Sequence, residues 1–290
     1  ITVRDVPGDA QICSTTYAGL PGDVNVGDDI LIDDGHVGLR AVAVTDTDVR
    51  CVVTVPGRVS NHKGINLPGI EVSVPALSDK DKDDLRWALQ AGVDLVALSF
   101  VQRPEDIDDV RAIMDEVGWH RPVLAKIEKP QAVDRLEAII EAFDGIMVAR
   151  GDLGVELPME QVPLVQKRAI TACRAAAKPV IVATQMLDSM ETSTRPSRAE
   201  ASDVANAVLD GADALMLSGE TSVGQHPALV VETMARIIEY VEEKALGEVS
   251  QTEDNRTGST ARAITRAAVE VAEETDASFI VTFTETGLTP

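Results

Sequence analysis

A lysine and two carboxylates stand at the ends of two apolar segments of the chain. Lys126 and Glu128 lie two residues apart at the end of the apolar run that starts at Val123, and Asp152 follows the next apolar run. The two-residue alternation of a strand would place Lys126 and Glu128 on the same face. Alone, such a pair is more typical of a structural ion pair. Together with Asp152, it would suit Mg2+ held by few protein ligands plus substrate oxygens, with Lys126 supplying positive charge where an oxyanion develops.

Further polar residues follow other apolar runs or lie among turn residues. Gly151, between Arg150 and Asp152, would let a backbone N–H approach a small anion closely. Thr184 is either a hydroxyl satisfied within the core or a group that hydrogen-bonds substrate or relays a proton, and the sequence leaves both open. Lys63 lies either in a solvated loop or in a mobile lid that brings it to a phosphate. The remaining apolar runs end in Ser99, Ser218 and Glu220.

These residues can form one site only if the strands that carry them lie side by side with their C-terminal ends together. After Pro75, apolar runs alternate with helical patterns, which indicates a parallel α/β sheet covered on both faces. A first helix is predicted from the N-cap Ser78 to Gly92, before the run Leu95–Leu98. The other predicted helices are 104–117, 131–142, 160–177, 199–210 and 228–243, and the strands between them are 123–127, 145–149, 180–184 and 214–217.

The spread of polar residues over successive strand ends bears on the topology. An open, doubly wound sheet would concentrate such groups at one switch point. Here five successive strands each contribute, which favours a (β/α)8 TIM barrel with its site at the C-terminal mouth. About five of the eight strand–helix units are expected within this chain.

The composition before Pro75 and after Leu246 predicts different units. Residues 1–74 are dense in Gly, Pro and Asp between short β-branched runs, which is typical of a small antiparallel barrel or sandwich. Residues 75–246 hold the parallel unit, and 247–258 read as a polar linker. Residues 259–290 are expected to begin a further α/β unit, with a helix at 259–274 and a strand at 279–284.

The overall charge excludes some classes of function. The 290 residues carry a formal net charge of −22, which disfavours nucleic acid and anionic membranes as partners. No apolar run approaches the ~20 residues of a membrane span, and no signal peptide opens the chain. The three cysteines have no metal-ligand spacing and indicate free thiols of a reducing compartment, so a cytoplasmic location is expected.

Several motifs together resemble those of the pyruvate kinase family. The resemblance spans essentially the whole chain, with the motifs in the family's order and spacing, and only the set of them is specific. The motifs are Ala125–Lys129, Met147–Gly154, Ala183–Leu187, Leu217–Thr221, Arg195–Glu200 and Lys63–Gly69.

The resemblance implies a (β/α)8 barrel with a small β lid domain inserted after its third strand, followed by a C-terminal α/β domain. It implies that Lys126 stabilises the transition state and that Glu128 and Asp152 hold Mg2+ or Mn2+. The Arg150–Asp152 loop and Thr184 would hold the substrate carboxylate and face the carbon to be protonated. Ser218 and Glu220 would line the same mouth, and Lys63 would reach nucleotide phosphates.

The same resemblance implies the substrates and the assembly. Phosphoenolpyruvate and ADP would yield pyruvate and ATP, and the complete protein would be a homotetramer. The family's first three barrel strands, which carry K+ ligands, are expected before Ile1, and most of the C-terminal domain beyond Pro290. K+ is therefore an expected cofactor whose ligands lie outside this chain, and the chain alone is expected to be inactive.

Two other functions compete with this interpretation. A barrel aldolase would use Lys126 as a Schiff-base nucleophile, but Glu128 and Asp152 would keep that lysine protonated, which such chemistry does not tolerate. The second alternative is a truncated or scaffolding form without turnover.

Overall fold

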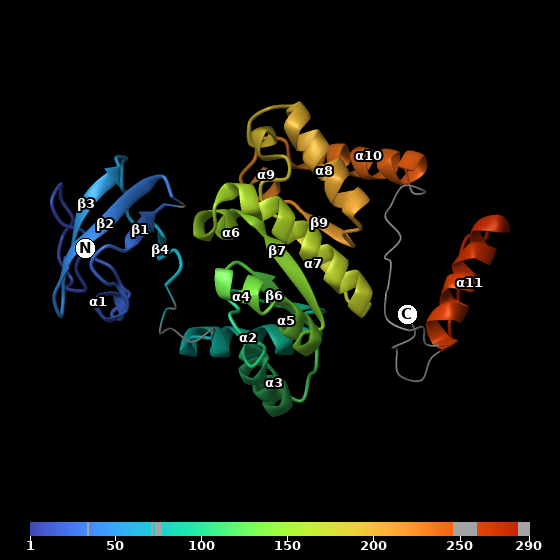
Figure 1. Ribbon diagram of the computed structural model, residues 1–290, viewed down its shortest axis with the longest axis horizontal. Coiled ribbons are helices and arrows are strands. Elements are labelled where there is room, and N and C mark those ends of the chain that lie inside the picture. The colour runs from blue at the N-terminus through green and yellow to red at the C-terminus, as the bar shows by residue number, and fades with distance from the viewer. Residues whose placement is uncertain (34, 71, 73–76, 246–259, 284–290) are drawn as a thin grey trace. The chain divides into compact units, whose positions relative to one another are not determined.

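Figure 1 shows the computed structural model of the chain, which describes residues 1–33, 35–70, 72, 77–245 and 260–283. The chain divides into two compact units, Ile1–Ser250 and Gln251–Pro290. The predicted linker 247–258 lies outside the described residues. In the second unit, helix α11 (Thr260–Glu274) matches the helix predicted there.

The strand predicted at 279–284 is wrong for its described part. Residues 279–283 have no strand conformation, and Phe279, Val281 and Phe283 are exposed. An apolar run becomes a strand only beside a hydrogen-bonded neighbour, and the described residues of this unit offer none.

An antiparallel sheet forms from the Gly- and Asp-rich N-terminal part of the chain. Its strands are β1 (Asp29–Ile32), β2 (Val37–Val44), β3 (Val49–Val55) and β4 (Ile65–Asn66), in the order β3-β2-β1-β4. The turn between β1 and β2 is closed by the His36 N–H donating to the Asp33 carbonyl oxygen at 3.0 Å. A short helix, α1 (Leu20–Asp23), packs Leu20 into the core of this sheet.

A five-stranded parallel sheet follows. Its strands are β5 (Val96–Leu98), β6 (Val123–Ile127), β7 (Gly145–Ala149), β8 (Val180–Ala183) and β9 (Ala214–Met216), which neighbour one another in chain order. A doubly wound sheet would reverse its order at a switch point. The unreversed order is that of consecutive units of a (β/α)8 barrel, as the strand ends predicted.

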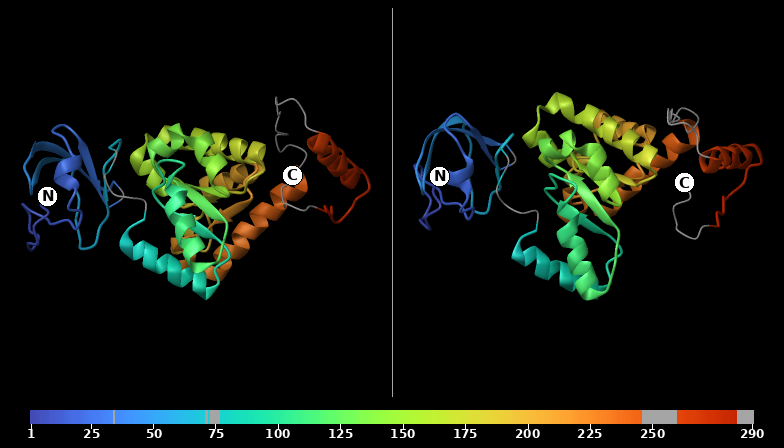
Figure 2. Two further views of the ribbon diagram at one scale, coloured as in Figure 1. Left: turned by 90° about the horizontal axis from the view of Figure 1, so that it is seen from below. Right: turned by 60° about the horizontal axis from the view of Figure 1, so that its bottom comes forward.

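Helices connect the parallel strands and flank them in both views of Figure 2. The elements between consecutive parallel strands are α3 (Asp106–Val117), α4 (Pro130–Asp134), α5 (Leu136–Ala142), α6 (Arg150–Glu156), η1 (Met159–Gln161), α7 (Val162–Ala176), η2 (Asp188–Glu191) and α8 (Arg198–Asp210). Helix α2 (Asp79–Ala91) precedes β5, and α9 (Gly219–Ser222) and α10 (Pro227–Ala245) follow β9. As predicted, α2 is capped by Ser78, in a capping box with Asp81, and ends at the left-handed Gly92.

Two of the predicted helices differ in detail. The helix predicted at 131–142 is interrupted at Arg135, whose φ of −109° and ψ of 23° are not helical, so α4 and α5 are separate. The helix predicted at 160–177 starts as the 3-10 turn η1 and becomes α-helical only at Val162.

The two faces of the parallel sheet have different surroundings. Ala125 and Ile127 of β6 and Val148 of β7 belong to the large core cluster built with the helices. Lys126, which alternates with them, pairs with Met147 of β7 on the opposite face. In a barrel the helix-covered face is the outer one, so Lys126 lies on the face that a closed barrel would turn inward.

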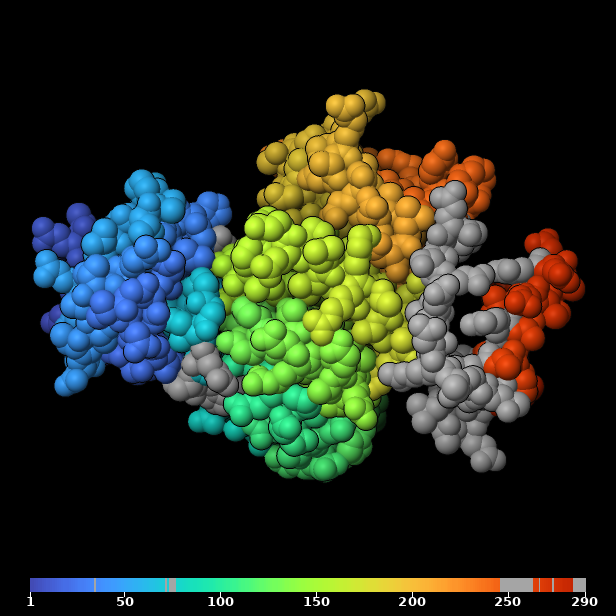
Figure 3. All heavy atoms as spheres, in the orientation of Figure 1, coloured from blue at the N-terminus to red at the C-terminus, as the bar shows by residue number. Residues whose placement is uncertain are grey.

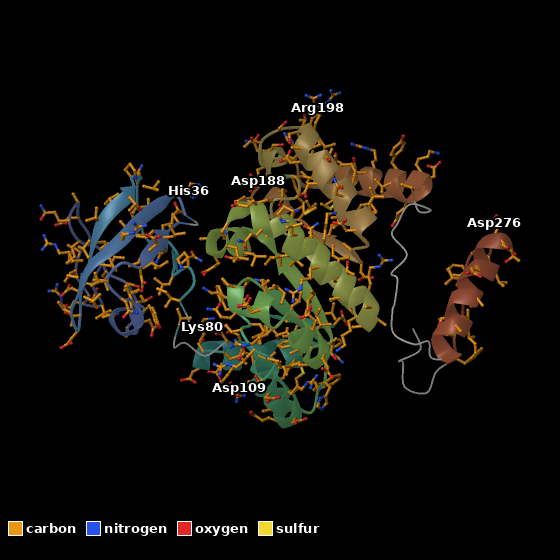
Figure 4. The ribbon with its side chains drawn as sticks, in the orientation of Figure 1. His36, Lys80, Asp109, Asp188, Arg198 and Asp276 are labelled. Atoms are coloured by element: carbon orange, nitrogen blue, oxygen red, sulfur yellow. The ribbon has the colours of Figure 1, made fainter. Side chains whose placement is uncertain are left out.

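Charged residues lie at the surface of this unit. Figure 4 labels Lys80 on α2, Asp109 on α3 and Arg198 on α8, and all three are exposed. In the space-filling view, the segment coloured from green to orange forms one continuous body (Figure 3). None of the described helices combines the length and the apolar character needed to cross a membrane.

Candidate active site

The predicted site residues of the parallel sheet gather at one edge. Because the strands are parallel, their C-terminal ends meet there, and we call it the carboxyl edge. It brings together residues that lie at or just beyond the C-terminal ends of β5 to β9, namely Ser99, Lys126, Glu128, Asp152, Thr184, Ser218 and Glu220.

Lys126 and Glu128 form the ion pair that their spacing predicts. Lys126 Nζ lies 2.5 Å from Glu128 Oε1 and donates to Ser99 Oγ at 2.9 Å. The second carboxylate oxygen of Glu128 accepts the backbone N–H of Phe100 at 2.7 Å. The Glu128 side chain is 1% exposed, while that of Lys126 is 24% exposed, so the ammonium group retains access to solvent.

The surroundings of Glu128 raise its pKa. Burial is the largest cause, and the nearby negative charge of Asp152 acts in the same direction. Lys126 and the Phe100 N–H oppose the shift without cancelling it. The two carboxylates therefore repel each other in a partly desolvated place, and a cation between them would relieve that repulsion.

Asp152 is held in the first turn of α6. No hydrogen bond or ion pair to its half-buried carboxylate occurs within the part of the chain that the structure describes. A free carboxylate beside a buried one supplies the hard oxygen donors that Mg2+ or Mn2+ prefers. Among the described residues, no group of three or more His, Cys, Asp or Glu side chains could hold a metal.

Arg150 does not lie in a loop, in contrast to the expectation. It begins α6, and its guanidinium is occupied: Nη1 pairs with Asp203 Oδ2 at 2.6 Å, and Nη2 donates to the Thr184 carbonyl oxygen at 2.8 Å. The side chain is 11% exposed. Arg150 therefore ties α8 and the end of β8 to α6, and it is not free to bind an anion through its side chain.

Thr184 has an unusual backbone conformation. The strand predicted to include it ends at Ala183, since Thr184 has φ 67° and Gln185 has φ 53°. A β-branched residue is strained in this left-handed region, and such strain clusters at functional sites. The Thr184 hydroxyl accepts the Gly151 N–H at 2.7 Å and donates to the Ala183 carbonyl oxygen at 2.6 Å.

Gly151 therefore contacts Thr184 in this structure rather than an anion. A Cβ atom at Gly151 would lie 3.4 Å from Thr184 Oγ1. The close approach that the glycine was predicted to allow is made to that hydroxyl, which brings α6 and the end of β8 together.

Glu220 and Ser218 have different roles at the end of β9. Glu220 is buried, and its two oxygens accept the N–H groups of Leu187 at 3.1 Å and Ser218 at 2.7 Å. It thus joins the segments that follow β8 and β9. The Ser218 hydroxyl is buried without a hydrogen-bond partner among the described residues, so it is the one of the two with unused bonding capacity.

Lys63 lies in the antiparallel unit. Its ammonium pairs with Asp33 Oδ1 at 2.7 Å, and the side chain is 37% exposed. Its predicted role at a phosphate would require this pair to break.

Sequence reasoning gave no role to Phe100, Lys129 or Glu156. Lys129 Nζ lies 2.5 Å from Glu156 Oε1, in a pair more deeply buried than Lys126–Glu128. Glu156 could have been singled out from the sequence, because it is a lone carboxylate between the apolar Val155 and Leu157.

The chain is similar to known proteins over nearly its full length. A family model described as "Pyruvate kinase, barrel domain" matches residues 3–231. A pyruvate kinase of Corynebacterium efficiens is 57% identical over 288 residues, covering 99% of this chain and 60% of the relative. A pyruvate kinase of Mycobacterium intracellulare is 58% identical over 287 residues, with the same coverage.

A solved structure is similar as well. The crystal structure of a pyruvate kinase from Cryptosporidium parvum matches with a TM-score of 0.87 and 38% identity, covering 99% of this chain and 61% of that one. The chain thus spans about 60% of the length of the curated relatives it matches.

Proposed function

The chain belongs to the pyruvate kinase family, and from that premise we propose that the complete polypeptide encoded by its gene transfers the phosphoryl group of phosphoenolpyruvate to ADP in a Mg2+-dependent reaction. The observation that carries this proposal is the Lys126–Glu128 pair at the carboxyl edge, near the carboxylate of Asp152, which has no partner among the described residues. A requirement for K+ and a homotetrameric assembly belong to the same proposal.

Glu128 and Asp152 would hold the divalent cation. Two carboxylates are few ligands for Mg2+, which commonly keeps water and substrate oxygens in its coordination shell. When bound, the cation would neutralise charge on the phosphate and on the oxygen that phosphate leaves.

Lys126 would stabilise the enolate that remains when the phosphoryl group departs. Its ammonium is anchored by Glu128 and Ser99, so it is oriented before substrate arrives and needs little reorganisation during the reaction. Its ammonium is paired with a carboxylate and does not lie in an apolar pocket, which disfavours a Schiff-base mechanism.

The segment around Thr184 would position the carboxylate of the substrate and the carbon that is protonated. Gly151 and Asp152 on α6 lie beside Thr184 through the hydrogen bond between the Gly151 N–H and the Thr184 hydroxyl. Arg150 would act by holding these segments together. Ser218 and Glu220 would line the mouth, and Lys63 would reach nucleotide phosphates after leaving Asp33.

We also propose that the 290-residue chain alone does not turn over. Its five described parallel strands leave β5 and β9 as sheet edges, whereas a closed barrel has none. Open edges expose unpaired backbone groups and favour aggregation.

A coupled assay tests the proposed activity. The complete polypeptide is incubated with phosphoenolpyruvate, ADP, Mg2+ and K+, and pyruvate formation is followed through lactate dehydrogenase. We expect turnover that is abolished when either ADP or Mg2+ is omitted and weakened when Na+ replaces K+. Absence of pyruvate under all these conditions, from protein shown to be folded, would overturn the proposal.

A further inference from the structure

A second ion pair, Lys129–Glu156, lies next to the Lys126–Glu128 pair in the sequence, because Lys129 directly follows Glu128. Lys129 Nζ is 2.5 Å from Glu156 Oε1, and the two side chains are 7% and 1% exposed. The other oxygen of Glu156 is buried without a hydrogen-bond partner among the described residues. The roles proposed above assign nothing to this pair.

The pair joins the two segments that carry the proposed metal ligands. Lys129 directly follows Glu128 at the end of β6. Glu156 is the last residue of α6, one helical turn beyond Asp152. The i, i+4 spacing places Asp152 and Glu156 on the same side of the helix. Ion pairing at Glu156 therefore constrains where Asp152 lies relative to Glu128.

Phe100 links the pair to Glu128 from the end of β5. Its backbone is left-handed, with φ 56°, a conformation that costs a bulky residue energy. Its N–H donates to Glu128 Oε2 at 2.7 Å, and Lys129 Nζ lies 5.7 Å from the centroid of its ring. The ends of β5 and β6 and helix α6 thus meet around Lys129.

We propose that the Lys129–Glu156 ion pair is a positioning device that sets the separation of the Glu128 and Asp152 carboxylates and thereby the affinity for the divalent cation. This inference rests on the proposed function. Two apolar residues of similar volume would fill the same space with little loss of stability. Apolar contacts would not fix the position of α6 relative to the end of β6, because they have no preferred direction. A short charged hydrogen bond does fix it.

Direct cation binding tests the role without relying on activity. Mn2+ affinity is measured by electron paramagnetic resonance on the complete polypeptide and on its Glu156→Gln, Lys129→Arg and Lys129→Met/Glu156→Met variants. The control is Arg168→Gln, which breaks the exposed Arg168–Glu137 pair between α7 and α5. Groups that orient metal ligands typically contribute about 10- to 100-fold to affinity.

We expect Glu156→Gln and the double variant to bind Mn2+ at least about 10-fold more weakly. Lys129→Arg, which keeps the charge and its hydrogen bonds, should retain most of the affinity, and Arg168→Gln should match the parent protein. In activity assays, the Mg2+ concentration needed for half-maximal activity should rise by a larger factor than kcat at saturating Mg2+ falls. A general loss of folded protein would not produce this difference.

The outcomes separate this inference from the proposed function. If Glu128→Gln weakens Mn2+ binding while Glu156→Gln and the double variant bind normally, the positioning role is refuted and the metal site stands. If Glu128→Gln also binds Mn2+ normally, the metal site itself is refuted, and the positioning role with it. Should Glu156→Gln fail to fold, the double variant decides, because it leaves no buried charge unpaired.

Discussion

Replacing Lys126 with Met removes one charge from the carboxyl edge and keeps an unbranched side chain of similar length. The ammonium now lies 2.5 Å from Glu128 Oε1 and 2.9 Å from Ser99 Oγ. The variant therefore loses the positive charge that we propose stabilises the enolate. Among the described residues, it also leaves Glu128 with only the Phe100 N–H as a partner.

The expected effect on rate follows from the loss of a preorganised electrostatic group. Removing one neutral oxyanion donor costs about 10²–10³ in kcat, or roughly 3–4 kcal/mol, and a full charge should cost more.

The stability of the Lys126→Met variant should fall as well. Removing one partner of a fully buried pair costs about 3–5 kcal/mol. Because Lys126 is 24% exposed, solvent screens part of this interaction, and we expect a loss below that range.

The loss of stability should depend on pH. Burial already raises the pKa of Glu128, and Lys126 counteracts that shift, so Lys126→Met should raise the pKa further. A carboxyl group whose folded-state pKa exceeds its unfolded value stabilises the fold at low pH, and this contribution is lost as pH rises through the folded-state pKa. The deficit of the variant should therefore be largest near neutral pH and shrink on acidification.

Two measurements on the complete polypeptide decide this prediction. Steady-state kinetics at saturating substrates and Mg2+ give kcat, and urea unfolding at several pH values gives the free energy of unfolding. A folded variant with parental kcat would refute the assigned role of Lys126. A stability deficit that grows as pH falls would refute the account of Glu128.

Three further predictions concern the carboxylates, a buried thiol and the chain itself. Glu128→Gln and Asp152→Asn should each raise the Mg2+ concentration needed for half-maximal activity, since two carboxylates leave few ligands to lose; unchanged values in both would make the pair structural. Burial raises the pKa of Cys173 to about 12, so only about 1 in 10,000 of its thiols is ionised at pH 8, and mass spectrometry should find it unalkylated by iodoacetamide until urea is added. The 290-residue chain alone should elute as aggregates and show no activity in the coupled assay, and robust turnover would show that β5 and β9 need no further strands.

Much of the fold was predictable because its signals are local. The bounds of β6 and β7 follow from apolar runs between polar or turn residues, and the structure places both strands where they were predicted. Helix α6 was not predicted because Gly151 and Gly154 disfavour helix. Tertiary hydrogen bonds override that preference: the Gly151 N–H binds the Thr184 hydroxyl, and Arg150 binds Asp203.

The candidate site, too, was predictable only where its signals are local. The Lys126–Glu128 pair could be predicted because the period of a strand puts residues two apart on one face. The left-handed conformation of Thr184 could not, because local preference opposes it in a β-branched residue. The Lys129–Glu156 pair spans 27 positions, and only the tertiary fold brings the last residue of α6 to the residue that follows Glu128.

We propose that Glu128 and Asp152 together hold the divalent cation beside Lys126. The most direct test is a crystal structure of the complete polypeptide grown with Mn2+ and phosphoenolpyruvate, with data collected at the manganese absorption edge. We expect one anomalous peak within about 2.0–2.4 Å of an oxygen of each carboxylate. A peak that contacts neither carboxylate, with substrate bound at the carboxyl edge, would contradict it.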